Sequence, residues 1–397
     1  MENLKEKARA YALRNAISYG GKASQGAIIS GLFNEGLKKE NIKSISSEIK
    51  EVIEEVNALS IEEQKKEFEK VKDIVSEREV REGLAELPNA ENVVMRFSPS
   101  PSGALHVGHA LTACLNFDYS EKYSGKFYVR IEDTNPDNIY KPAYKLIEKD
   151  SKWLFDGKAE IIIQSDRMEL YYKYAKELLE KGFAYICTCA SEDFKHFVEF
   201  KENCPCRNNE QGENLMRWDK MFKEYNAGEA VLRFKSLLGM TDPNPAMRDF
   251  PLARVNENTH VRQKKKYRVW PLMNLAVTVD DLELGVTHII RAKEHRDNAK
   301  RQEMIYKVLG KQAPWNGFLG RLHLKDMRLS ASEITAGVES GKYSGWDDPE
   351  LLTVSSLKAK GYKPEAFWKL AEHIGVSEND KTMDRKDLFE LLDTFNK

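Results

Sequence analysis

The sequence predicts an α/β fold in which a parallel sheet is covered by helices, with a helical region before it and another after it. Two observations lead to this prediction. From about residue 91 onward, short apolar runs rich in β-branched and aromatic residues alternate with longer amphipathic runs, as in sheets whose strands are joined by crossover helices. Residues 1–90 and the segment after Trp346 carry helical patterns alone.

The N-terminal ninety residues are expected to form four helices. Three of them cover residues 4–19, 24–37 and 42–59, and Ser60 with Glu63 forms a capping box that begins the fourth. The region carries no pattern of catalytic or metal-binding residues. We therefore interpret it as a helical appendage that could dock a protein partner.

The alternating region begins after Pro88. Strands are expected at residues 93–97, 126–131, 161–163 and 183–187, and helices at residues 106–124, 142–155 and 168–181. Residues from about 187 to 265 break the alternation and are expected to be an insertion between two halves of the sheet. The sheet is expected to resume with strands at residues 266–270, 287–292 and 318–323, and with helices that begin at Pro271 and at Glu294. Ligands bind beyond the carboxyl ends of such strands, where the loop after residue 97 and the acidic residue Glu132 lie.

The overall composition is that of a soluble chain without a strong charge bias. Lys and Arg (62) nearly balance Asp and Glu (63), so nucleic acid would have to be bound by local basic patches. No apolar run reaches the roughly 18 residues that would favour a membrane span, and the N-terminus lacks the apolar core of a signal peptide. We expect a cytoplasmic protein that does not bind membranes.

The loop after the first strand carries the clearest sign of a binding site. Residues 96–109 read R-F-S-P-S-P-S-G-A-L-H-V-G-H, and the prolines and glycine prevent a helix before Leu105. His106 and His109 therefore share one face of a first helical turn, with Gly108 between them. The free N–H groups and the dipole of a helix N-terminus favour anions such as phosphate. Two histidines at an exposed helix start are the alternative, and the preceding strand and Ser/Pro turn favour phosphate.

Four of the five cysteines form two C-x-C pairs, namely Cys187, Cys189, Cys204 and Cys206. This arrangement suits tetrahedral zinc held by four thiolates, which leaves no open coordination position and so indicates a structural role. Four free thiols are the alternative, while a cytoplasmic setting disfavours disulfides. Cys114 falls in the apolar pattern of a helix and is expected in the core.

Several motifs taken in order resemble the class I aminoacyl-tRNA synthetases. Residues 98–109 resemble the HIGH signature, and R-I-E-D-T at residues 130–134 resembles the glutamyl and glutaminyl branch. Similar segments are V-W-P at 269–271, D-D at 280–281, R-A-K-E-H at 291–295, Y-S-G-W-D-D-P at 343–349 and, as in archaeal glutamyl-tRNA synthetases, Y-G-G-K-A at 19–23. The resemblance implies a Rossmann-like catalytic domain over residues 91–335. It also implies an acceptor-stem and zinc-knuckle subdomain at about 187–265 and a helical stem-contact region at 336–397. We expect the anticodon-binding β-barrels with which archaeal relatives continue to be absent.

The resemblance implies activation of L-glutamate by ATP with Mg²⁺, followed by transfer to tRNA(Glu). By the same resemblance, the residues that contact ATP are Ser98, Pro99, Ser100, Gly103, His106, Gly108, His109 and Glu294, and the catalytic ones are His106, His109, Ser332 and Arg328.

For glutamate, the resemblance assigns Glu132 to the ammonium group, Arg96 and Arg291 to the side-chain carboxylate, and Ser100 and Asn274 to supporting contacts. Arg291 would separate glutamate from glutamine, because glutaminyl relatives usually lack it. The alternatives are a surface ion pair of Glu132 with Arg130, and Arg291 as a partner of Asp280 or Asp281.

The sequence departs from the family pattern at two places. In L-S-A-S-E at residues 329–333, Ala331 fills the middle lysine position of the KMSKS loop and Glu333 stands where archaeal relatives often have lysine, so Arg328 or Lys325 would supply the charge. Met273 replaces a tyrosine of the amino-acid pocket. These departures keep two other functions open: a paralogue that binds tRNA or a partner without catalysis, and an enzyme that activates glutamate for another acceptor. The basic run at residues 262–268 could equally contact RNA phosphates or form a solvated hairpin tip.

Overall fold

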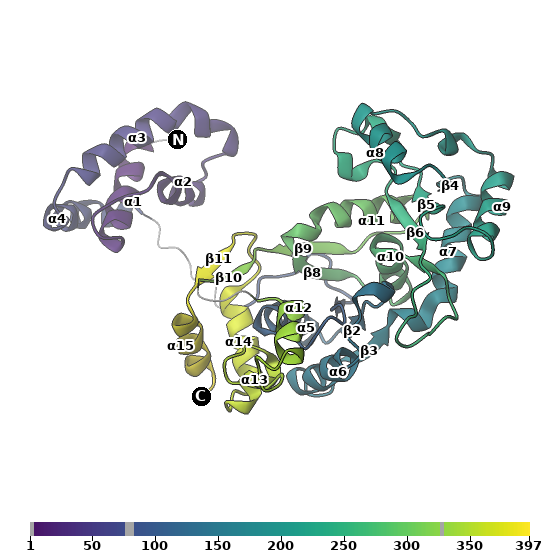
Figure 1. Cartoon of the computed structure of the whole chain (residues 1–397). Coiled ribbons are helices and arrows are strands. Elements are labelled where there is room, and N and C mark those ends of the chain that lie inside the picture. Colours follow the sequence, from purple (N-terminus) through teal and green to yellow (C-terminus); the bar gives the residue numbers. More distant parts are fainter. Residues whose placement is uncertain (1–3, 76–82, 326–328) are drawn as a thin grey trace. The chain divides into compact units, whose positions relative to one another are not determined.

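The computed structural model describes residues 4–75, 83–325 and 329–397, and the chain divides into two compact units, residues 1–82 and 83–397 (Figure 1). In the described part of the first unit the helices are α1 (Leu4–Ser18), α2 (Gln25–Asn34), α3 (Ile42–Asn57) and α4 (Ile61–Val71), with short 3-10 turns at Lys39–Asn41 and Lys72–Ile74. The four predicted helices are confirmed, and so is the capping box of Ser60 and Glu63. The first unit has its own apolar core, to which Leu13, Ile28 and Val52 belong.

The second unit is organised on a layer of five parallel strands. These are β1 (Val94–Phe97), β2 (Lys126–Ile131), β3 (Glu160–Ile163), β8 (His288–Ala292) and β9 (Trp315–Leu319). The sheets β1-β2-β3 and β8-β9 meet where the amide of Thr287 donates to the carbonyl of Val94 at 2.9 Å. The spatial order is therefore β3-β2-β1-β8-β9, and the winding reverses between β1 and β8. This is the position where doubly wound sheets bind their ligands.

Helices cover both faces of this layer. Figure 1 shows α5 (Val107–Lys122) and α6 (Ala143–Leu154) on one side, and α10 (Met273–Glu283) and α11 (Arg296–Val308) on the other. Short 3-10 turns follow several strand ends, at Pro136–Asn138, Gln164–Arg167 and Lys293–His295. The arrangement confirms the predicted α/β class with a parallel sheet and crossover helices.

The insertion contains an antiparallel sheet, β4-β5-β6-β7, formed by β4 (Ala184–Cys187), β5 (Val231–Phe234), β6 (Pro251–Val255) and β7 (Val269–Pro271). Around it lie α7 (Met168–Glu180), α8 (Ser191–Phe200), α9 (Gln211–Met221) and 3-10 turns at Pro205–Asn208, Gly239–Thr241 and Pro245–Met247. The prediction that strands 183–187 and 266–270 belong to the parallel sheet was wrong. A short apolar run does not encode the direction of its partner, and here β4 pairs with β5 and β7 with β6.

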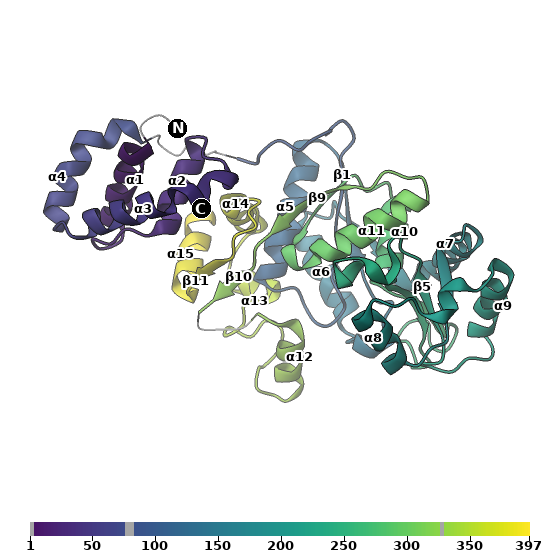
Figure 2. The same ribbon diagram turned by 90° about the horizontal axis from the view of Figure 1, so that it is seen from above.

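The C-terminal part combines helices with one further strand pair. The elements are β10 (Leu322–Leu324), α12 (Ala331–Glu339), α13 (Val354–Ala359), α14 (Pro364–Ile374), β11 (Lys381–Met383) and α15 (Arg385–Phe395). The predicted strand at 318–323 is in fact the end of β9 followed by β10, which pairs in parallel with β11. Within the second unit, Figure 2 shows α8 and α9 at one end and α13 to α15 at the other. None of the described helices has the length and apolar character that a membrane crossing would need.

Candidate active site

The two predicted glutamate-binding arginines lie on neighbouring strands. Arg96 belongs to β1 and Arg291 to β8, the two strands between which the winding reverses, and both side chains are buried. The cation of Arg96 contributes to lowering the pKa of Arg291, second only to burial, so the two guanidinium groups lie close enough to repel each other. The structure thus brings together side chains that are 195 positions apart in the sequence.

Arg96 is held in place by a buried carboxylate. Its Nε and Nη2 each donate to one oxygen of Asp281 at 3.1 Å, and Nη1 of Arg130 donates to the same carboxylate at 2.5 Å. Burial alone would raise the pKa of Asp281, but Arg130 and Arg96 lower it to about 2. Nη2 of Arg130 in turn donates to Glu132 at 3.0 Å. The alternative of an ion pair between Glu132 and Arg130 is therefore confirmed, but its placement at the surface was wrong, because Arg130 is completely buried.

Asp280 completes this cluster of charges from the neighbouring position on α10. It accepts hydrogen bonds from Nε of Arg167 at 2.7 Å and from Gln164 and Tyr171, and Nε of Arg130 lies 3.7 Å away. The charged cluster, defined as Arg96, Arg130, Arg167, Arg291, Glu132, Asp280 and Asp281, thus joins four guanidinium groups to three carboxylates. One positive charge remains for a ligand.

Arg291 is not paired with either aspartate, which were its alternative partners. Its Nη1 donates to Gln302 at 2.9 Å and its Nη2 to Asn316 at 2.5 Å, and Gln302 in turn donates to the predicted polar contact Asn274 at 3.5 Å. Nε of Arg291 is buried and has no hydrogen-bond partner among the described residues. Burial and Arg96 lower the pKa of Arg291 to about 10, so it is charged at neutral pH. This guanidinium has a donor and a charge available for an anion.

The predicted histidine pair opens α5. His106 is the N-cap residue and its Nδ1 accepts from the amide of His109 at 3.3 Å, while the two rings stack with centroids 3.7 Å apart. Burial and the neighbouring His109 hold the pKa of His106 well below its usual range, and burial lowers the pKa of His109 to about 4. Both imidazoles are therefore neutral at pH 7 and can offer N–H donors to phosphate oxygens without carrying charge.

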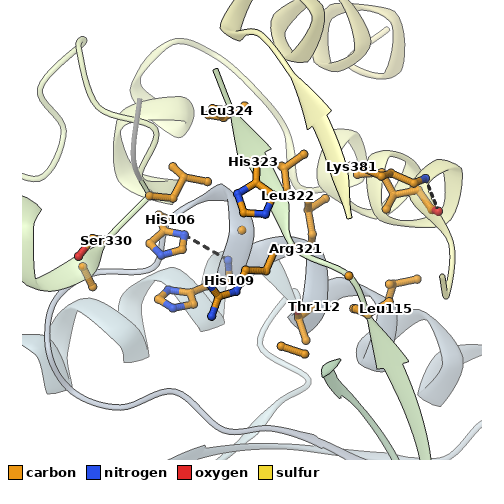
Figure 3. A pocket seen from close by; sticks show the side chains of 18 of the residues that line it. His106, His109, Thr112, Leu115, Arg321, Leu322, His323, Leu324, Ser330 and Lys381 are labelled. Carbon is orange, nitrogen blue, oxygen red and sulfur yellow. Dashed lines mark hydrogen bonds between the residues drawn. The ribbon is translucent and has the colours of Figure 1, made fainter. Parts of the chain in front are cut away.

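A cavity of about 1030 Å³ lies beside these rings (Figure 3). His106, Gly108 and His109 form part of its wall, and Ser330, Ala331 and Ser332 at the start of α12 form another part. Gly108 leaves little room for a side chain, because a Cβ atom would lie 3.2 Å from the His106 ring, closer than most Cβ contacts. Arg321, His323, Lys325 and Lys381 also line the cavity, so its chemistry suits a polyanion.

The C-terminal part of the chain closes over the histidine turn. The amide of Val107 donates to the carbonyl of Leu352 at 2.9 Å, and that of Val354 to the carbonyl of Leu105 at 2.8 Å. The carboxylate of Asp150 accepts from the amide of Leu105. These contacts could not be predicted from the sequence, because no local pattern links residues 105–107 to residues 352–354.

The remaining predicted nucleotide contacts occupy varied positions. Ser98 has a buried Oγ with no hydrogen-bond partner among the described residues, and the carbonyl of Pro99 accepts from the amide of Glu132. Ser100 is exposed. Gly103 is packed by the protein itself, since a Cβ atom there would approach Trp346 to 2.7 Å.

Two further predicted residues lie near the cations of the cavity. The carboxylate of Glu294 pairs with Arg321, which lines the cavity. Lys325 is exposed in the cavity wall, whereas Arg328 lies outside the described residues.

The four cysteines of the C-x-C pairs converge. Their Sγ atoms all lie within 4.8 Å of one another, and three of the separations are 3.7 to 3.8 Å. Tetrahedral thiolates about 2.3 Å from a zinc ion would be separated by about 3.8 Å, so the geometry fits that ion. All five cysteines are free, and Cys114 is buried in the core as predicted.

The basic run at residues 262–268 follows a turn between β6 and β7. The amide and carbonyl of His260 pair with those of Lys264, and Arg262 and Gln263 bind the carboxylate of Asp166. The run therefore forms a hairpin tip whose lysines at positions 264 and 265 are exposed. A hairpin tip is also able to contact RNA, so this geometry leaves both interpretations of the run open.

Comparison with known proteins agrees with this geometry. Residues 92–395 match the family described as tRNA synthetases class I (E and Q), catalytic domain. Glutamate–tRNA ligase from Methanobrevibacter smithii is 42% identical over 399 residues, which cover all of this chain and 71% of that protein. The ligase of the same name from Methanothermobacter marburgensis is 43% identical over 385 residues and is covered over 69% of its length.

Among solved structures, glutamate–tRNA synthetase from Elizabethkingia anophelis superimposes with a TM-score of 0.54 at 22% identity, over 76% of this chain and 70% of that one. At that identity the superposition supports the fold alone. The family match and the two archaeal relatives, however, extend over most of the chain. The chain therefore belongs to the class I tRNA synthetases of the glutamate and glutamine group.

Proposed function

We propose that this chain is an ATP-dependent glutamate–tRNA ligase, which activates L-glutamate and transfers it to tRNA(Glu). The observation that carries the proposal is the single excess positive charge of the charged cluster, next to the unpartnered Nε of Arg291. Glutamate has one ammonium and two carboxylate groups and therefore carries one net negative charge. Glutamine has no net charge, so the cluster is complementary to glutamate.

Glu132 would bind the ammonium group, because its carboxylate is 15% exposed and is held by the buried Arg130. Arg291 and Arg96 would bind the side-chain carboxylate, with Asn274 as a neutral contact behind Arg291. Ser100 remains a proposed supporting donor. Met273, which is 39% exposed, would contribute apolar surface where relatives place a tyrosine.

Activation requires one glutamate carboxylate oxygen to attack the α-phosphorus of ATP, which forms the adenylate and releases pyrophosphate. The imidazoles of His106 and His109 and the cations of the 1030 Å³ cavity would hold the phosphates. In the second step, a hydroxyl of the terminal tRNA ribose attacks the carbonyl of the adenylate and AMP leaves. No protein nucleophile is needed in either step.

Mg²⁺ would enter with the nucleotide, where it would neutralise part of the phosphate charge. Phosphate oxygens of the nucleotide would supply ligands for this ion.

We also propose that Cys187, Cys189, Cys204 and Cys206 bind a structural zinc ion. The support is the match between their Sγ separations and a tetrahedral site. A reducing, cytoplasmic setting would keep these thiols available for the metal. The hairpin tip at residues 262–268 is the proposed phosphate contact of the insertion, and the helices of residues 4–75 remain a proposed docking unit for a protein partner.

Glutamate-dependent exchange of labelled pyrophosphate into ATP, measured with and without tRNA, tests the proposal. We expect exchange with glutamate and at least about a hundredfold less with glutamine at equal concentration, because glutamine leaves the excess charge unpaired. Absence of exchange in both conditions, together with tRNA binding, would favour a non-catalytic tRNA-binding protein. Exchange without charging of tRNA would favour an enzyme that uses another acceptor.

A further inference from the structure

A buried histidine links the hairpin tip of the insertion to the peptide that carries Glu132. His260 is completely buried at the base of the tip, and its ring stacks on Trp270 with centroids 4.8 Å apart. Its Nδ1 accepts from the amides of Arg262 and Gln263 at 3.1 and 3.0 Å. Since Nδ1 accepts both bonds, the ring proton lies on Nε2.

The Nε2–H of His260 is directed at the loop that follows β2. It lies 2.9 Å from the carbonyl oxygen of Asp133 and donates to it, across 127 positions of sequence. Asp133 immediately follows Glu132. The bond therefore restrains the backbone next to Glu132, whose side chain pairs with Arg130. The imidazole therefore holds two segments at once, the tip through Nδ1 and the Glu132 loop through Nε2.

Other contacts fix the same loop and leave few ways for it to move. The Asp133 carboxylate accepts from the amide and hydroxyl of Ser165 at 2.8 and 2.7 Å and from the hydroxyl of Tyr144 at 2.7 Å. The amide of Glu132 donates to the carbonyl of Pro99 at 2.9 Å. The loop is thus held from the turn after β1, from the end of β3 and from α6. From the insertion, His260 reaches Asp133, while Arg254, Asn256 and Asn258 bind Asn135 and Asp137 farther along the loop.

We propose that His260 is a positioning residue that fixes Glu132 for recognition of the substrate ammonium group, and that it does so through its bond to the Asp133 carbonyl. This inference rests on the proposed function for the role of Glu132. It adds a mechanical link by which the insertion, rather than the parallel sheet alone, sets the affinity for the amino acid.

Two substitutions by amide side chains separate the hydrogen bonds made by Nδ1 from the one made by Nε2. In His260→Gln the side-chain amide nitrogen lies as many bonds from Cβ as Nε2 does, so it can still donate to the Asp133 carbonyl. In His260→Asn the side-chain oxygen takes the place of Nδ1 and can still accept from the tip. This shorter side chain does not reach the Asp133 carbonyl. Both variants lose the ring and its stacking on Trp270, so each is the control for the other.

The first readout is the pyrophosphate exchange assay at saturating ATP and tRNA. We expect His260→Asn to raise KM for glutamate about tenfold, the value of one lost hydrogen bond, with kcat and KM for ATP changed less than about twofold. His260→Gln should keep KM for glutamate within about twofold of the parent chain. Equal KM values in the two variants, or a fall in kcat alone, would overturn the proposal, because a ring that only fills space affects both variants alike.

The second readout does not need activity. Hydrogen–deuterium exchange of the Glu132 amide in the unliganded full chain should be about tenfold faster in His260→Asn than in His260→Gln. Equal exchange in the two variants would also refute the link. If the parent chain lacks exchange activity, the proposed function fails while this measurement still decides whether His260 restrains the Glu132 loop.

A matched pair of tyrosine variants tests the loop from a different element. Tyr144→Phe removes one donor to Asp133, whereas Tyr174→Phe, on α7, removes a similar donor to Glu283 at 2.6 Å. We expect a higher KM for glutamate in Tyr144→Phe and the parent value in Tyr174→Phe. Parent values in both, with His260→Asn also unchanged, would contradict the proposal.

Discussion

Asp281→Asn is the substitution whose effect follows most directly from the structure. The asparagine keeps the shape and one acceptor, but it removes the charge that balances Arg96 and Arg130 in a completely buried site. Breaking a buried pair in this way costs about 3 to 5 kcal/mol in unfolding free energy. The lowered pKa supplies a second value, because a fall from 3.8 to about 2 corresponds to roughly 2 kcal/mol. We expect a loss of about 3 kcal/mol at pH 7, between these two values.

The assay is urea unfolding followed by tryptophan fluorescence. All six tryptophans lie between residues 153 and 368, so the signal reports the second unit alone. Asp219→Asn, on the exposed face of α9, is the control and should change stability by less than about 0.5 kcal/mol. Because the pKa of Asp281 is lowered by folding, its contribution is present above about pH 4 and is lost as the pH falls towards 2, and the asparagine variant should lack this part of the acid dependence. Equal stability of the two variants would refute the assignment of Asp281 as the anchor of the arginines.

Three other predictions follow from the site. Cys204→Ser should reduce bound zinc, measured by atomic absorption, from about one ion per chain to well below one, whereas Cys114→Ser should leave the zinc content unchanged; equal metal content in both variants would contradict the zinc site. Arg291→Lys should raise KM for glutamate at least about tenfold and narrow the preference over glutamine, because an ammonium group cannot reproduce the planar fork, and an unchanged preference would remove Arg291 from the pocket. Burial lowers the pKa of His109 to about 4, so the unfolded chain takes up a proton at this histidine before the folded chain does. The free energy of unfolding should therefore fall by about 3 kcal/mol as the pH drops from 6.5 to 4. His109→Gln should reduce this pH dependence in the same fluorescence assay, and an unchanged pH dependence would contradict the burial of His109.

Local patterns were sufficient to predict most elements of this fold. The Ser/Pro turn and the helix that begins at Val107 lie where the prolines place them, and Ser60 with Glu63 caps α4. The partners of strands could not be predicted in the same way. The run at 183–187 has the apolar character of a parallel strand, yet it pairs antiparallel with β5, since composition records burial and not direction.

The candidate site was predicted unevenly for a similar reason. The residues proposed to contact the ligands, such as His106 and Arg291, belong to recognisable motifs. The residues that hold them are less visible: Asp281 was noted as part of a motif but not as the anchor of two arginines, and Gln302 and His260 lie in segments with no pattern of their own. Their roles depend on contacts between distant parts of the sequence, which only the folded chain reveals.

The parallel pairing of β10 with β11 has a practical consequence for dividing this molecule into modules. Lys381, in the strand paired with Leu322, lines the same cavity as His106. A fragment that stopped after α13 would retain every signature motif and yet lack one wall of this cavity. Domain exchange with a homologue would therefore need to transplant the terminal helices together with the catalytic sheet.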